Sequence, residues 1–91
     1  MEEKLGGTAV VQNDASEFLL EYYVMEDREK KYGIKIEKKE KKPNGLVLCE
    51  DYTSEYIIKS KSRANDILEI LMRNKVTPIT AESVLNDLKY L

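Results

Sequence analysis

The sequence predicts an α+β fold in which a three- or four-stranded antiparallel sheet is followed by a two-helix hairpin, in the order βββαα. Through residues 16–37, apolar side chains alternate with other residues at the period of 2 that is typical of strands. Pro43, Asn44 and Gly45 form a strong hairpin-turn signal. After Ser60 the apolar period changes to 3.6, which indicates amphipathic helices.

The segment 16–25 is expected to be a central strand, because apolar groups lie on both of its faces. The preceding residues 1–15 are expected to be a loose N-terminal segment with one short strand at most, over Thr8–Val11, and residues 16–91 to be a single α+β domain. The alternation places Phe18, Leu20, Tyr22 and Val24 on one face and Leu19, Glu21, Tyr23 and Met25 on the other.

Two further strands follow, at 31–38 and 46–50, and the tight turn makes their pairing antiparallel. The segment Tyr56–Ile58 is either a continuation of the last strand or a short separate strand, and the pattern leaves both open. The core face of strand 31–38 carries Tyr32, Ile34 and Ile36.

The chain ends in two helices, expected at 62–74 and 78–90. Ser62 is the predicted N-cap of the first helix, and Asn74 is its predicted end. Each helix has only about three turns, so both must pack on the sheet or on each other. The apolar stripes that would make this contact are Ala64, Ile67, Leu68, Leu71 and Met72 in the first helix and Val84, Leu85, Leu88 and Leu91 in the second.

Length and composition exclude several classes of protein. A chain of 91 residues is the size of one domain, and 42% hydrophobic with 35% charged residues is too apolar for a disordered chain. No histidine and a single cysteine exclude a disulfide framework, the common zinc sites and catalysis by a histidine base. No apolar run is long enough for a membrane helix, and the N-terminus does not resemble a signal peptide, so we expect a cytoplasmic protein.

The sequence contains no set of residues typical of an enzyme, a metal site or a cofactor site. Cys49 has no base that would activate it as a nucleophile. Glu50 and Asp51 are neighbours on a strand and therefore point to opposite faces, where they cannot share a proton. Gly6 and Gly7 precede a strand-like run rather than a phosphate-binding helix. We therefore expect a protein that is not an enzyme and that uses no cofactor.

Charge is distributed unevenly along the chain, although the formal net charge is only −2. Residues 28–42 contain eight basic against three acidic side chains, whereas residues 1–27 contain one basic against seven acidic. One interpretation is that the two segments pair as strands and complement each other in solvent. The alternative is a surface for an anionic partner, formed by Lys31, Lys35, Lys38, Lys39, Lys41 and Lys42.

Six tyrosines against one phenylalanine add to this alternative, because aromatic rings beside lysines can stack on the bases of single-stranded nucleic acid. Against it, Tyr22 and Tyr32 share their faces with apolar residues, so we expect them to be half-buried with the hydroxyl outward.

Three segments carry a resemblance to a known family: LEYYVMED at 20–27, KYGIKI at 31–36 and NDILEILMRNKVTPITAESVLNDL at 65–88. Together they resemble a family of short uncharacterised bacterial proteins of the clostridial type, best represented in spore-forming anaerobes. The resemblance covers residues 16–91 and implies a cytoplasmic bacterial protein with strands before helices. Because that family has no assigned activity, the resemblance implies no functional residues.

The leading functional hypothesis is a non-enzymatic interaction or regulatory module that binds another protein or a second copy of itself. A fold of this size has few layers with which to cover both faces of strand 16–25. The candidate protein interface is the second face of that strand, with Leu19, Tyr23 and Met25. The alternative is nucleic-acid binding through the basic hairpin 28–42.

Overall fold

Four strands are followed by two helices along the chain. A computed structural model describes residues 2–12, 17–55 and 58–89. The predicted α+β class, an antiparallel sheet followed by two helices, is confirmed. The elements are β1 (Glu2–Gln12), β2 (Glu17–Glu26), β3 (Tyr32–Lys41), β4 (Val47–Thr53), α1 (Lys61–Arg73) and α2 (Pro78–Lys89).

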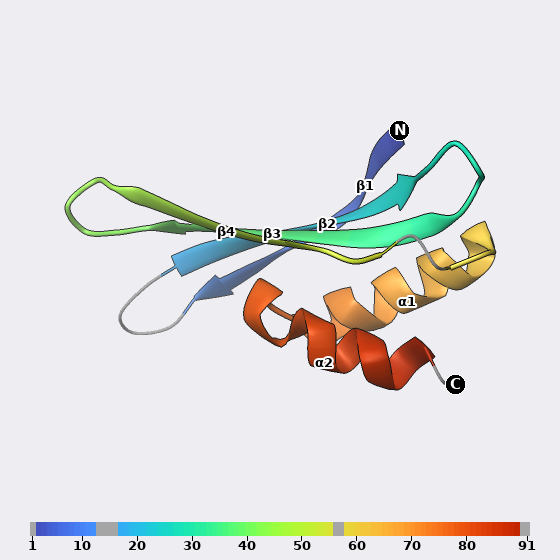
Figure 1. Cartoon of the computed structure of the whole chain (residues 1–91). Coiled ribbons are helices and arrows are strands. Elements are labelled where there is room, and N and C mark those ends of the chain that lie inside the picture. Colours follow the sequence, from blue (N-terminus) through green and yellow to red (C-terminus); the bar gives the residue numbers. More distant parts are fainter. Residues whose placement is uncertain (1, 13–16, 56–57, 90–91) are drawn as a thin grey trace.

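The sheet has the order β1-β2-β3-β4, and each strand runs antiparallel to its neighbour in the sequence. The predicted pairing around the Pro43–Gly45 turn is therefore confirmed, and β1 and β4 are the edge strands. Both helices lie on one face of the sheet, below it in Figure 1. Helix α1 packs against β1, β2 and β3, while α2 packs against β3 and β4.

The N-terminal segment differs from the expectation. In place of a loose terminus with one short strand, the structure has the strand β1, which pairs with β2 from Glu2 opposite Glu26 to Gln12 opposite Glu17. The register shifts once, between Leu5 and Gly7. Apolar and polar residues do not alternate clearly along this strand, so the sequence pattern does not reveal it. Its position is defined by pairing with β2 and by packing against α1.

Two glycines of β1 allow α1 to approach the strand closely. A Cβ atom at Gly6 would overlap Leu68 Cδ2, and one at Gly7 would overlap Met72 Sδ. Leu68 and Met72 both belong to the predicted apolar stripe of α1. The glycine pair is therefore a packing feature of β1 and α1.

The core lies between the sheet and the helices, where the sequence placed it. Leu20, Ile34 and Ile36 of the sheet are fully buried together with Leu71 of α1. Tyr22 is also fully buried, so the expected outward hydroxyl is wrong: its Oη donates a hydrogen bond of 2.9 Å to the carbonyl of Val76, between the helices. Burial raises the pKa of this phenol to about 12. The remaining members of the core are Val24, Ala64, Ile67, Leu68, Val76, Ala81, Leu85 and Leu88.

Helix α1 begins at Lys61, one residue before the predicted range 62–74, and ends as predicted at Asn74. Ser60, not Ser62, is the N-cap, and its hydroxyl accepts a hydrogen bond from the backbone N–H of Arg63 at 3.3 Å. Asn74 is the C-cap. Beyond it Lys75 has a φ of 51°, a left-handed conformation that glycine usually supplies and that the sequence therefore did not reveal.

The end of β4 leads the chain back along β3. Ile58 forms an antiparallel bridge with Tyr32, so part of the predicted Tyr56–Ile58 segment does lie beside β3. Residues 56 and 57 lie outside the described residues, as does Leu91 of the predicted stripe of the second helix.

Candidate interaction surfaces

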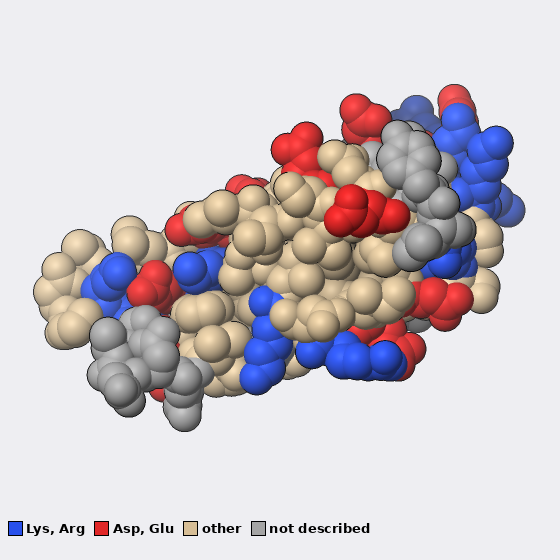
Figure 2. All heavy atoms as spheres, turned by 90° about the horizontal axis from the view of Figure 1, so that it is seen from below, with Lys and Arg blue, Asp and Glu red and all other residues tan. Residues whose placement is uncertain are grey.

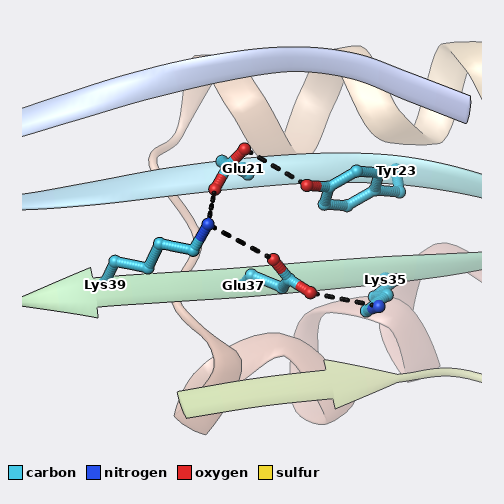
Figure 3. Close-up of polar contacts among 5 residues, drawn as sticks. All are labelled: Glu21, Tyr23, Lys35, Glu37 and Lys39. Carbon is cyan, nitrogen blue, oxygen red and sulfur yellow. Dashed lines mark hydrogen bonds and ion pairs between the residues drawn. The ribbon is translucent and has the colours of Figure 1, made fainter. Parts of the chain in front are cut away.

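A ring of five polar side chains occupies the face of the sheet that carries no helix (Figure 3). Tyr23 Oη donates to Glu21 Oε2 at 3.1 Å, and Glu21 Oε1 lies 2.7 Å from Lys39 Nζ. Lys39 also lies 4.0 Å from Glu37, whose other oxygen is 3.1 Å from Lys35 Nζ. Lys35 in turn lies over the Tyr23 ring, 5.5 Å from its centroid, which closes the ring.

The charges in this ring compensate one another. Glu21 and Glu37 are directly opposite on β2 and β3, so their carboxylates would repel without the ammonium of Lys39 between them. The hydrogen bond from Lys39 lowers the pKa of Glu21 and, reciprocally, raises the pKa of Lys39. Burial, assisted by the hydrogen bond to Glu21, raises the pKa of Tyr23. The ring therefore joins β2 to β3 across the helix-free face of the sheet.

The predicted protein interface on this face is only partly exposed. Leu19 and Tyr23 are half-buried, and Leu19 lines a shallow hollow together with Lys39 and Lys41. Met25 is only 8% exposed, so its expected place in an exposed patch is wrong. The sequence assigned Met25 to the correct face, but strand alternation does not show what covers a face.

The predicted lysine patch does not form one surface. Alternation along β3 places Lys35, Lys39 and Lys41 on the helix-free face and Lys38 on the other, where its Nζ lies 4.5 Å from the centroid of the Phe18 ring. Five of these six lysines have an acidic neighbour, but only the Lys39–Glu21 pair joins the basic segment 28–42 to the acidic segment 1–27; the other acidic partners belong to the basic segment itself. The pairs are Lys31–Glu29, Lys35–Glu37, Lys38–Glu40, Lys39–Glu21 and Lys42–Glu40.

The tyrosines do not form a shared stacking platform within the described part of the chain. Tyr22 is buried, and Tyr32 and Tyr52 pack against the core from the helix side of the sheet. Tyr23 lies on the opposite face, in the polar ring. Tyr56 and Tyr90 lie outside the described residues.

The most exposed apolar group of the sheet lies at the tip of the hairpin between β3 and β4. Leu46 is 60% exposed, Val47 57% and Leu48 48%. This segment, which we call the hairpin tip, extends beyond the end of both helices in Figure 1. At the left of Figure 2, uncharged residues form the tip, beyond a mixed group of basic and acidic side chains.

Backbone geometry closes the hairpin tip in a tight turn and leaves one edge of its second strand open. Gly45 has a φ of 89°, and Lys42 N donates to Leu46 O at 2.7 Å. At the other end of the strand, Ser54 N donates to Ile34 O at 2.8 Å. Because an antiparallel ladder alternates, the backbone groups of even-numbered residues point toward β3, and those of Val47, Cys49 and Asp51 point to the open edge.

The sequence pattern predicted β4 but not the exposure of its apolar residues. The signal was available: Leu46–Cys49 is a run of four apolar residues with no alternation, directly after a tight turn. Such a run is typical of a strand buried on both faces. The helices are too short to reach it, and that fact depends on the three-dimensional arrangement.

Other features of the described residues fit no further site. Cys49 is an exposed free thiol beside Lys39 on the helix-free face. Within residues 2–12, 17–55 and 58–89, no group of three or more acidic, cysteine or histidine side chains is placed to hold a metal ion. Over the same residues, neither helix is long and apolar enough to cross a membrane.

Comparison with known proteins gives a match at the level of a family. No curated protein and no solved structure shows significant similarity to this chain. One family model matches residues 1–89, so it includes β1, which lies outside the segments that carried the resemblance above. The bacterial, clostridial origin implied by that resemblance stays a prediction. The chain belongs to the family of unknown function DUF6514.

Proposed function

We propose that this protein is a non-enzymatic module that works by binding another protein chain, with the hairpin tip as its binding surface. One observation carries the proposal: three consecutive large apolar side chains, Leu46, Val47 and Leu48, are each about half exposed or more. They lie on a strand whose outer backbone groups are open. Contiguous exposed apolar groups and open strand edges are typical of protein interaction sites.

The helix-free face is a weaker candidate for the same role. Of its three predicted interface residues, Leu19 and Tyr23 are half-buried and Met25 is buried. The Tyr23 hydroxyl already donates to Glu21, and a partner would have to replace that bond. The hairpin tip offers apolar area without such a cost.

Nucleic-acid binding is the less favoured alternative. The lysines of the basic segment lie on two faces of the sheet and next to glutamates, so they present little uncompensated positive charge to a phosphate backbone. We expect a regulatory role in the bacterial cytoplasm, in line with the single cysteine and the resemblance described above.

Affinity capture from the cells that produce the protein tests the proposal. The tagged wild-type chain, Leu48→Asp, Tyr23→Ser and Ile79→Asp would be compared, with bound proteins and nucleic acids identified in parallel. Ile79 is the matched control, because it is an exposed apolar residue (78%) on α2 rather than on the hairpin tip. We expect bound protein to be lost with Leu48→Asp and retained with Ile79→Asp.

Two other results would contradict the proposal. Loss of bound protein with Tyr23→Ser and not with Leu48→Asp would move the interface to the helix-free face. Recovery of nucleic acid that declines steeply with salt and is indifferent to Leu48→Asp would favour the anionic partner. Reversing the charge of Lys38 and Lys39 separates the two cases. It should reduce the recovery of nucleic acid, but it should leave protein binding at the hairpin tip unchanged, because that binding does not require these lysines.

A further inference from the structure

The open edge of β4 has the composition of an inner strand. Edge strands of natural proteins are usually protected by lysine, proline or a bulge. Along the outer part of β4 the residues are Val47, Leu48 and Cys49, and the register with β3 is regular from Val47 to Thr53. An unprotected edge of this kind is complementary to another extended strand.

The order of charges around the hairpin tip is self-complementary. Lys41 and Lys42 lie at the end of β3 next to the turn, level with Val47 and Leu46, whereas Glu50 and Asp51 follow the apolar residues along β4. A two-fold axis between two antiparallel β4 strands reverses one hairpin relative to the other. The basic end of each hairpin then lies beside the acidic end of its copy.

The faces of the sheet agree with this arrangement. Lys42 lies beside Glu40, on the same side of the sheet as Glu50, whereas Lys41 and Asp51 lie on the helix-free side. Antiparallel pairing keeps each side chain on its own side. Lys42 would therefore share a face with Glu50 of the copy, and Lys41 with Asp51 of the copy.

We propose that the occupant of the hairpin tip is a second copy of this chain, with the two β4 edges pairing antiparallel to form one continuous eight-stranded sheet. This inference rests on the proposed protein-binding function and names its partner. The charge order favours a copy over an unrelated chain, because no unrelated strand is required to carry the same pattern in reverse.

The register centred on Val47 matches the apolar side chains best. It places Val47 opposite its copy and Leu46 opposite Leu48 of the copy, on both sides of the axis. Positions 50 and 51 of one chain are then level with positions 44 and 43 of the other chain, in the turn that follows Lys42, so like charges are not opposed. The tip extends beyond the helices of one chain (Figure 1), so the helices of the two copies lie on the same face of the joined sheet, at its opposite ends.

Disulfide trapping tests both the pairing and its register. Val47 becomes directly opposite its copy in a hydrogen-bonded pair, where Cα atoms are about 5.5 Å apart, within the range of about 4.4–6.8 Å that a disulfide spans. The variant Val47→Cys/Cys49→Ser should therefore form a disulfide dimer under mild oxidation in native buffer and not in denaturant. The matched control, Ile79→Cys/Cys49→Ser, also carries a single cysteine, but on α2 rather than on the β4 edge, so it should form no disulfide dimer.

Sedimentation equilibrium of the purified chain measures the association without any added cysteine. The contact is small, so we expect a concentration-dependent monomer–dimer equilibrium rather than a permanent dimer. Leu48→Asp should raise the dissociation constant by about tenfold or more, while Ile79→Asp leaves it unchanged. Circular dichroism of Leu48→Asp checks that the variant folds.

A charge exchange tests the complementarity itself. Lys42→Glu should weaken the dimer severalfold, because it places a negative charge near Glu50 of the copy. Adding Glu50→Lys to the same chain should restore the dimer, because both 42–50 pairs across the axis are then reversed. Failure of the second change to restore the dimer would contradict the proposed arrangement.

The outcomes separate this inference from the proposed function. A wild-type chain that is monomeric at all concentrations, together with no trapping at Val47→Cys, overturns the second-copy inference. If Leu48→Asp still loses a captured protein in that case, the tip binds an extended segment of a different chain and the proposed function stands. A dimer that is indifferent to Leu48→Asp also overturns the inference, because its interface lies elsewhere.

Discussion

The two edges of the sheet are built in opposite ways. At β1 the register shifts between Leu5 and Gly7, and helix α1 packs closely against the strand through Gly6 and Gly7. At the outer part of β4 the register is regular, the helices do not reach, and Val47 and Leu48 are exposed. An irregular register and a covering helix are both devices that prevent a strand edge from pairing with another chain.

This difference indicates that the two edges of the sheet differ in how readily they could pair with another chain. The chain protects the β1 edge around Gly6 and Gly7, although Val10 further along β1 is 53% exposed, and it leaves consecutive apolar residues on the regular outer part of β4. An exposed apolar edge carries a risk of aggregation, and a single lysine in place of Val47 or Leu48 would reduce it. We interpret the contrast as support for a binding role of the β4 edge.

The largest effect that the comparison predicts is on stability, from one substitution made at each edge. Leu68→Ala should lower the free energy of unfolding by about 2–4 kcal/mol, because Leu68 is buried beneath Gly6 and its truncation leaves a cavity. Leu48→Ala should lower it by less than about 0.5 kcal/mol in the monomer, because its side chain is about half exposed. Urea denaturation of both variants at low protein concentration measures this, and similar losses would contradict the contrast between the edges.

Sequence reasoning predicted most of the fold, and the reasons differ by element. The alternation through Phe18–Val24 and Ile34–Ile36 identified the central strands, because half-buried strands must alternate. Strand β1 was predicted as a short strand over Thr8–Val11 at most, because glycines and the covering helix determine the pairing of the rest and neither leaves a periodic pattern. The N-cap was misplaced because serines at 60 and 62 are equally suitable by type, and only backbone conformation distinguishes them.

A smaller effect concerns the two glycines of the protected edge. Gly6→Ala should destabilise the fold by about 1–3 kcal/mol, because the new methyl group would overlap the buried Leu68 side chain. Gly7→Ala should cost less than about 1 kcal/mol, because its neighbour is the flexible end of the half-buried Met72. Thermal unfolding of the two variants compares them directly, and an equal cost would show that the strand, not α1, sets the requirement for glycine.

The candidate site was less predictable than the fold. Alternation placed Tyr23 and Met25 on the correct face, but it does not report whether that face is covered, and Met25 is buried. The charge pattern offered pairing between the acidic and basic segments, but most of the lysines instead lie beside a glutamate two residues away in the basic segment, and those contacts depend on side-chain conformation. The exposure of Leu46–Leu48 depends on where two helices end relative to a hairpin, and no local pattern carries that information.

The smallest predicted effect is the pH dependence of the strands between the edges. The ammonium of Lys39 lowers the pKa of Glu21 below its ordinary value of 4.5 in the folded state. Stability from this pair is therefore fully present above pH 4.5 and is lost as the pH falls through the lowered value. Glu21→Gln should flatten the acid side of the stability profile, measured by urea denaturation at several pH values.

A matched control is available on α1. Glu69 pairs with Arg73 at 2.9 Å, but both side chains are mostly exposed. Screening by solvent makes such a pair worth little, so Glu69→Gln should leave the acid side of the profile unchanged. An equal change in the two variants would mean that acid sensitivity comes from the general charge balance rather than from the Glu21–Lys39 pair.

The neighbour-to-neighbour order of the strands also bears on how the chain reaches its native state. Every strand pairs with the next one along the chain, so each hairpin can close over a short loop at low entropic cost. The contact of Gly6 with Leu68 instead joins segments near the two ends of the chain, and we expect it to form after the barrier to folding has been crossed. Leu68→Ala should then speed unfolding more than it slows refolding, whereas Gly45→Ala, at a turn with positive φ, should mainly slow refolding. Stopped-flow kinetics of the two variants would show whether the sheet assembles from the hairpin tip toward the N-terminal edge.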